Sequence, residues 1–155
     1  ISIGLVGSEM CIRDRLCFQA RKFGWRSFER ALDEIGGVPL PYQDAAESLT
    51  DCVVVFAHAE SCDESATARK RALQRTLKHV KWLCNKRSLT RVVLHSFTHL
   101  GAVSADPAFA RDFLNELAER LRRTGYEVCC TPFGHLCEWS IDVYGESLAK
   151  VYKQI

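Results

Sequence analysis

The sequence predicts a single α/β domain in which helices pack on a mixed β-sheet. Three features of the chain support this. Short apolar runs typical of buried strands alternate with two long segments of helical periodicity. Glycine, proline and aspartate separate these segments. No internal repeat or linker interrupts the 155 residues, a length that suits one domain with a substantial core.

The N-terminal half is expected to contribute mainly strands. Residues 16–20 (LCFQA) predict a short apolar strand, and residues 21–28 (RKFGWRSF) predict a hairpin that turns at Gly24. Residues 35–46 hold two glycines and two prolines and are expected to form a loop. Residues 51–60 (DCVVVFAHAE) are almost continuously apolar, which predicts a strand buried on both faces.

Two helices are expected next. The first begins at residue 63 or 65 and ends near Asn85, and its buried stripe is Leu73, Leu77, Val80 and Cys84. After a buried strand at 91–97 and a loop at 98–105, Asp106 and Pro107 predict a second helix start, and Gly125 its end. Residues 126–133 and 136–144 predict strands joined around Gly134, and residues 146–155 a short helix.

Composition favours a soluble globular protein, with 47% hydrophobic and 26% charged residues and a net charge of +2. No apolar run approaches the ~20 residues that span a bilayer, so no membrane association is expected. The eight cysteines form no C-x-x-C pair, which favours buried free thiols in a reducing compartment, the cytoplasm by default. No cofactor or metal is predicted.

The first residues differ from the rest. Residues 1–14 lack an initiating methionine and a basic segment, so they are a poor signal peptide. They resemble translated sequencing-adapter sequence, so we expect a non-native tail at 1–14 and a domain at 15–155.

Basic residues concentrate in the first predicted helix. Between residues 69 and 87 there are eight basic residues and no acidic one. Such a patch suits phosphate contacts to nucleic acid, although a solvated helix face remains the alternative. The candidate tRNA-binding residues are Arg69, Lys70, Arg71, Arg75, Lys78 and Lys81. A second cluster on the predicted hairpin holds Arg21, Lys22, Arg26 and Arg30.

The C-terminal half contains a series of motifs in a fixed order. A strand ends in F-x-H-L, a helix opens near a proline, and a G-Y-x-V strand, a P-F-G turn and G-x-x-L-A follow. In this order the motifs, firmest from Val92 onward, resemble the archaeal-type editing domain of threonyl-tRNA synthetase. The resemblance implies a fold related to D-aminoacyl-tRNA deacylases, often a homodimer, that hydrolyses seryl-tRNA(Thr). The implied partners are the aminoacylated 3′ end of tRNA and a threonyl-tRNA synthetase.

The resemblance also implies a set of site residues. The family's histidine in F-x-H-L matches His99. The family's tyrosine–lysine pair falls on Leu136 and Cys137, and its last glutamate falls on Lys150. Lys150 is therefore expected to supply the positive charge, with Glu138 or Glu146 supplying the carboxylate. The expected substrate contacts are Thr98, Phe133, Gly134 and His135. The last three are expected to form a tight turn that offers backbone N–H groups to an oxyanion.

The segment 131–140 (TPFGHLCEWS) allows other chemistry as well. In a strand, His135 and Cys137 share one face and Glu138 takes the other. Cys137 could be a thiolate with His99 or His135 as its base, or His135 and Cys137 could bind zinc with His95 or His99. The simplest alternative makes Cys137 a small apolar filler and His95 a satisfied core histidine. We expect deacylation of mischarged tRNA in trans; the alternatives are a non-catalytic tRNA- or RNA-binding relative and a thiol- or metal-dependent esterase.

Overall fold

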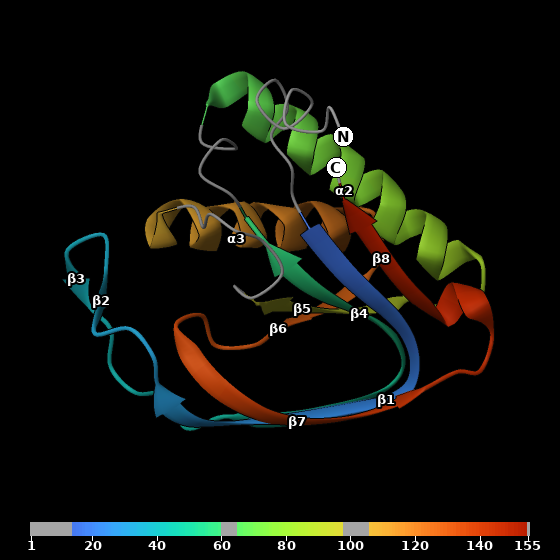
Figure 1. The fold of residues 1–155 in the computed structure, drawn as a ribbon, viewed down its shortest axis with the longest axis horizontal. Coiled ribbons are helices and arrows are strands. Elements are labelled where there is room, and N and C mark those ends of the chain that lie inside the picture. Colours follow the sequence, from blue (N-terminus) through green and yellow to red (C-terminus); the bar gives the residue numbers. More distant parts are fainter. Residues whose placement is uncertain (1–13, 60–64, 98–105, 155) are drawn as a thin grey trace, which may run out of the picture.

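The computed structural model describes residues 14–59, 65–97 and 106–154. In this part of the chain six strands form one mixed sheet, and two long helices cover one of its faces (Figure 1). The strand order is β6-β5-β4-β1-β7, with β8 also paired to β1. The predicted α/β class, with helices packed on a mixed sheet, is confirmed.

Two long antiparallel strands form the centre of the sheet, β1 (Asp14–Arg30) and β4 (Ala46–His58). β5 (Arg91–Ser96) and β6 (Glu127–Cys130) run parallel to β4, and the helices α2 (Ala66–Asn85) and α3 (Pro107–Arg123) form the crossovers that parallel pairing needs. β7 (His135–Val143) pairs with the second half of β1. The carboxyl ends of β4, β5 and β6 therefore meet at one edge.

The helix starts follow the sequence prediction. The Ser65 hydroxyl accepts the N–H of Ala68 at 3.2 Å and caps α2, and Asp106 caps α3 with Pro107 in the first position. Neither helix in the described segments is long and apolar enough to cross a membrane.

The predicted hairpin at Gly24 is wrong. β1 runs without a turn through Gly24, which pairs with Ser48 of β4 and Ser140 of β7. A Cβ on Gly24 would lie 3.3 Å from the Ser140 hydroxyl, so glycine here permits close approach of a neighbouring strand. The alternation of Phe23 and Trp25 with polar residues belongs to one continuous strand.

The predicted C-terminal helix is also wrong. Ser147–Ala149 forms a short 3₁₀ turn (η2), and Lys150–Gln154 forms β8, which pairs with the first residues of β1. The free edge of β1 provides backbone partners that the local sequence cannot reveal. The expected loop at 35–46 contains a small hairpin, β2 (Glu34–Ile35) and β3 (Val38–Pro39), and β4 begins earlier than expected, at Ala46.

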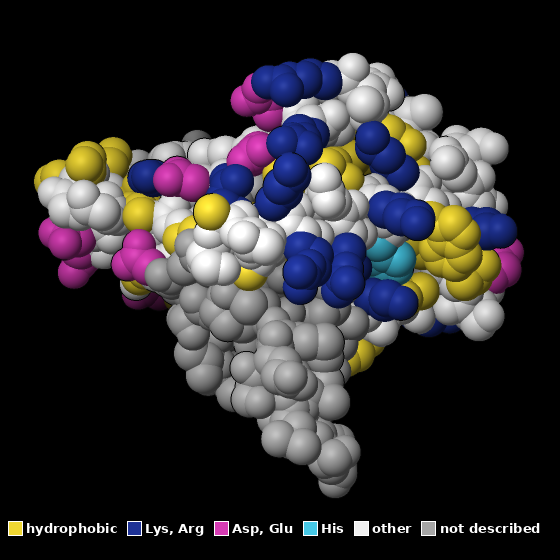
Figure 2. All heavy atoms as spheres, turned by 90° about the horizontal axis from the view of Figure 1, so that it is seen from above, with side chains coloured by type: hydrophobic (Ala, Val, Ile, Leu, Met, Phe, Trp, Pro, Cys, Tyr) yellow, Lys and Arg dark blue, Asp and Glu magenta, His cyan; other side chains and the backbone are white. Residues whose placement is uncertain are grey.

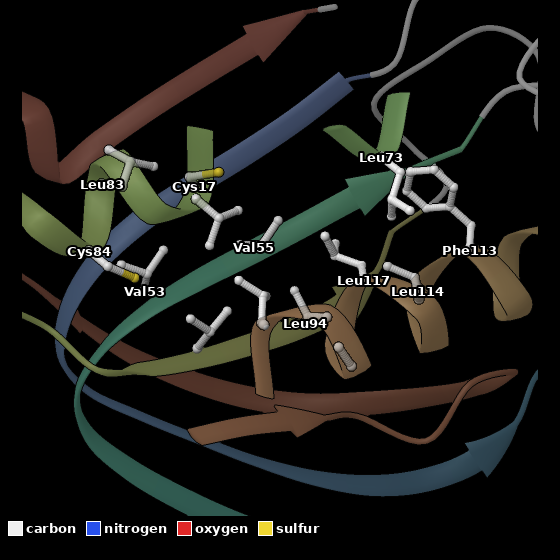
Figure 3. Packing of buried hydrophobic residues seen from close by; sticks show 14 of the residues in the cluster. Cys17, Val53, Val55, Leu73, Leu83, Cys84, Leu94, Phe113, Leu114 and Leu117 are labelled. Carbon is white, nitrogen blue, oxygen red and sulfur yellow. The ribbon is translucent and has the colours of Figure 1, made fainter. Parts of the chain in front are cut away.

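The apolar run of β4, residues 52–56, is buried on both faces of the sheet, as predicted. Val53 and Val55 pack toward the helices with Leu73 and Phe113, a cluster that Figure 3 shows. Val54 and Phe56 point to the other face. β1 and β4 bend strongly, and their far halves continue beside β7 as a lower layer (Figure 1). Because of this curvature, the sheet folds over the face that the helices do not cover.

Candidate functional site

A pocket of about 390 Å³ lies where β4 and β5 end, between the start of α3 and the turn that precedes β7. This is the edge of an α/β sheet where ligands commonly bind, and the volume suits a small-molecule site. Its aromatic lining residues are Phe28, Phe97, Phe133 and Trp139. Its polar lining residues are His58, His95, Ser96, Thr131 and His135. Thr98 and His99, both predicted site residues, lie outside the described residues.

The turn before β7 forms one wall of this pocket. The N–H of His135 donates to the carbonyl of Pro132 at 3.3 Å, with Phe133 and Gly134 between them. Gly134 has a φ of +78°, the value that the third position of a type II turn requires. A Cβ on Gly134 would lie 2.5 Å from Cδ2 of Leu40. Backbone angle and available space therefore both favour glycine.

The same turn is anchored to the end of β1. The Gly134 carbonyl accepts N–H groups from Ala31 at 2.7 Å and Leu32 at 3.1 Å. The N–H groups of Phe133 and Gly134 find no acceptor within the described ranges. Both residues line the pocket, and the turn that holds them is anchored through the Gly134 carbonyl. Such donors can bind an oxygen that becomes negatively charged during a reaction.

His135 fixes the turn. Its Nε2 accepts the N–H of Gln43 at 3.0 Å, so Nδ1 carries the proton and donates to the Phe133 carbonyl at 3.1 Å. The ring also lies against Tyr42, with centroids 5.6 Å apart. Both ring nitrogens of this predicted substrate contact are thus engaged within the protein.

His95 lies in the pocket wall. It is buried, and its Nδ1 lies 2.7 Å from the Thr131 hydroxyl, with the Phe56 ring edge-on to it. Burial lowers the pKa of His95 from 6.5 to about 4, so the imidazole is neutral at physiological pH. His95, His58 and Thr131 were not assigned to the site from the sequence. These three residues have one feature in common: each lies at the end of a strand or just beyond it.

The depressed pKa of His95 predicts a loss of stability in acid. Between pH 6.5 and 4 the unfolded chain binds a proton at this histidine and the folded chain does not, so stability falls as pH falls through this window. The contribution is up to about 3 kcal/mol. Denaturant titrations at pH 7 and pH 4.5 should show a smaller loss for His95→Gln than for the wild type. Equal losses would contradict this assignment.

Cys137 and Glu138 take opposite sides of β7, as the alternation predicted. Cys137 and Trp139 line the pocket. Glu138 is exposed and pairs with Arg26 at 3.3 Å. Burial raises the pKa of the Cys137 thiol. The thiol therefore stays protonated at neutral pH, the opposite of what a thiolate nucleophile requires.

Lys150 and the carboxylate of Glu138 or Glu146 were expected to replace the family's charged pair, but they do not reach the pocket within one chain. The Lys150 ammonium donates to the Gly145 carbonyl at 3.2 Å, and Lys150 pairs with Phe18 at the start of β8. Glu146 pairs with Arg87. None of Glu138, Glu146 and Lys150 lines the pocket. Across the described segments, no three His, Cys, Asp or Glu side chains gather in a way that could hold a metal ion.

The basic residues of α2 lie on the outer side of the helix layer. Figure 2 shows this face, with many Lys and Arg side chains over the helix. Lys70, Arg71, Arg75 and Lys78 are exposed, and Lys81 is partly exposed. Arg69 instead pairs with Glu116 of α3. In the second predicted cluster, the three arginines Arg21, Arg26 and Arg30 are each paired with a carboxylate.

The sequence of the chain is similar to that of known proteins. A model of the archaea-specific editing domain of threonyl-tRNA synthetase matches residues 14–155. The threonine–tRNA ligase of Thermofilum pendens is 28% identical over 140 residues, which cover 90% of this chain and 22% of that protein. The ligase of Thermococcus kodakarensis is 28% identical over 119 residues, 76% of this chain and 19% of that protein. The chain thus spans about a fifth of the length of these curated relatives.

A solved structure is similar in fold. The c-Myc DNA unwinding element binding protein superposes with a TM-score of 0.60 and 11% identity, covering 92% of this chain and 97% of that chain. This confirms the predicted D-aminoacyl-tRNA deacylase-like fold.

Proposed function

This chain belongs to the archaea-specific editing-domain family of threonyl-tRNA synthetase, and from this premise we propose that it removes serine from seryl-tRNA(Thr) in the pocket at the ends of β4 and β5. The family hydrolyses mischarged tRNA. A synthetase pocket built for threonine rejects serine poorly, since one missing methyl group is worth only ~1–3 kcal/mol. A second site that hydrolyses the wrong ester supplies the remaining discrimination.

The reaction is the hydrolysis of an ester. The oxygen of a water molecule attacks the carbonyl carbon of the aminoacyl group, and the carbonyl oxygen becomes an oxyanion. The bond to the terminal ribose oxygen then breaks. One proton of the attacking water goes to that oxygen and the other goes to the solvent, so free serine leaves with a carboxylate. The observation that carries the proposal is that Phe133 and Gly134 line the pocket on an anchored turn and that their N–H groups donate to no acceptor in the described residues, so we assign them to this oxyanion.

The remaining polar groups hold the substrate. Neutral His95 and Thr131 form a hydrogen-bonded pair that can orient the water or the ribose without carrying a charge. Thr98 and His99 follow Phe97, a pocket-lining residue, in the chain, and we assign them to the ribose and the water on the family pattern. Positioning of this kind can supply several kcal/mol of the barrier reduction.

Cys137 has no chemical step in this scheme. It stands where the family pattern has a lysine, in the pocket wall beside Trp139. A protonated, half-buried thiol there shapes the space available to the aminoacyl group.

The test is deacylation of seryl-tRNA(Thr) by the full chain, with Cys137→Ala beside it. We expect serine release by both proteins, with rates that agree within roughly threefold, less than ~0.7 kcal/mol of barrier. Loss of activity in Cys137→Ala, or on alkylation of the wild type, would favour the thiol-dependent esterase. Binding of tRNA without cleavage of any ester would show a non-catalytic binding module.

The setting of this activity is part of the proposal. We also propose that the chain acts in trans on tRNA charged by a threonyl-tRNA synthetase, in the cytoplasm. We also propose a homodimer, on the family pattern. Sedimentation of the purified chain measures the oligomeric state, and addition of the chain to a synthetase reaction measures action in trans.

A further inference from the structure

One face of α2 carries a straight row of cations with an aromatic residue in it. Arg71, Arg75, Lys78, Trp82 and Lys86 follow one another at intervals of three or four residues, so they share a face of the helix. All five are exposed. The row is about 22 Å long at 1.5 Å per residue. It lies outside the pocket, and the proposed reaction does not use Trp82.

Trp82 is held in place by its neighbours but is still open to solvent. The side chain of Trp82 is 43% exposed. The His79 ring stacks beside it with centroids 6.3 Å apart and planes 19° apart, and the Lys86 ammonium lies 5.3 Å from the ring centroid. Trp82 belongs to neither of the two hydrophobic clusters that form the core.

The stack is supported from below by a buried arginine. Arg15 is 2% exposed, and its guanidinium donates to Nδ1 of His79 at 3.1 Å and to the Thr76 hydroxyl at 3.0 Å. Because arginine only donates, Nδ1 accepts and the His79 ring is neutral. Burial, Arg15 and Lys153 lower the pKa of His79 to about 4, so the ring stays neutral in solution at physiological pH.

The chemistry of this face fits nucleic acid better than protein. Figure 2 shows Lys and Arg side chains around a histidine and a hydrophobic side chain on this face. The helix has no acidic residue from 69 to 87. Protein interfaces are depleted in lysine, whereas an aromatic platform among cations is typical of proteins that bind single-stranded nucleic acid.

We propose that Trp82 is a stacking platform for one unpaired base of an RNA, and that Arg71, Arg75 and Lys78 contact the adjoining phosphates. The choice of tRNA as that RNA rests on the proposed function. Trp82 is not among the residues that line the pocket. The platform therefore meets a nucleotide other than the one that carries the amino acid.

The test compares Trp82→Ala and Trp82→Phe in binding uncharged tRNA, a single-stranded RNA and a blunt RNA duplex. Trp82→Ala should weaken binding to the first two by about 5- to 150-fold, the ~1–3 kcal/mol of one base stack. Trp82→Phe should retain most of the affinity. The duplex has no unpaired base, so it should bind both variants and the wild type equally.

The salt dependence of RNA binding distinguishes stacking on Trp82 from contacts between cations and phosphates. Trp82→Ala should leave the slope of log K against log salt unchanged, whereas Lys78→Ala should reduce it by about 1. Unchanged affinity in Trp82→Ala, or an equal loss for the duplex, would overturn the proposal. Dissociation of a dimer by Trp82→Ala would assign the face to a second copy of the chain instead. Binding is measured without any ester, so a failure of the proposed deacylation leaves this result intact.

Discussion

Gly134→Ala is expected to reduce deacylation of seryl-tRNA(Thr) by about 100- to 1,000-fold, the effect of losing one oxyanion donor. Gly134 has a φ of +78°, and a Cβ there would lie 2.5 Å from Leu40. The new methyl group must therefore move either the turn or Leu40, and the turn carries the N–H groups of Phe133 and Gly134. Single-turnover deacylation measures the loss directly.

Gly125→Ala is the matched control. Gly125 also has a positive φ, +98°, but nothing lies within 4 Å of a Cβ built there, and it follows α3 outside the pocket. Both variants pay the strain of a side chain at positive φ, of order 1–3 kcal/mol. Only Gly134→Ala should lose activity. Equal activity in the two variants would remove the turn from the catalytic machinery.

Replacement of Arg71, Arg75 and Lys78 together by glutamine is expected to weaken tRNA binding on the order of 100-fold near physiological salt. All three residues are exposed on one face of α2, with no acidic residue in the helix to neutralise them. Three lost phosphate contacts should reduce the slope of log K against log salt by about 2 to 3. Binding of uncharged tRNA at several salt concentrations measures both quantities.

The control for this variant is a triple replacement on β1. Arg21, Arg26 and Arg30 are as basic as the α2 residues, but each is paired with a carboxylate. Their replacement by glutamine should leave both the affinity and the salt slope near the wild-type values. An equal effect of the two triple variants would mean that tRNA is attracted by net charge and not by α2.

The elements predicted correctly are those whose sequence pattern is local. The apolar run of β4 and the capping residues Ser65 and Asp106 act within a few residues of their own position. Gly24 and the segment from Lys150 depend on partners far away in the sequence. Gly24 has strands on both sides, and residues 150–154 pair with the start of β1. Such long-range pairing overrides local propensity.

The site was predicted in part for the same reason. Side chains alternate between the two faces of a strand, so the sequence of β7 alone predicted that Cys137 and Glu138 lie on opposite faces. His95 and Thr131 come together across two strands, and their hydrogen bond depends on the parallel pairing of β5 with β6. The expectation for Lys150 depended on a C-terminal helix that is instead a strand.

The most direct test of the proposed editing function compares the rates of amino acid release from seryl-tRNA(Thr) and from threonyl-tRNA(Thr). Both rates are measured in parallel with the same preparation of the full chain. Hydrolysis of the seryl ester with the threonyl ester largely preserved is the predicted result, since the pocket is proposed to act on the mischarged product. Equal stability of both esters, with tRNA still bound, would contradict an editing function for this pocket.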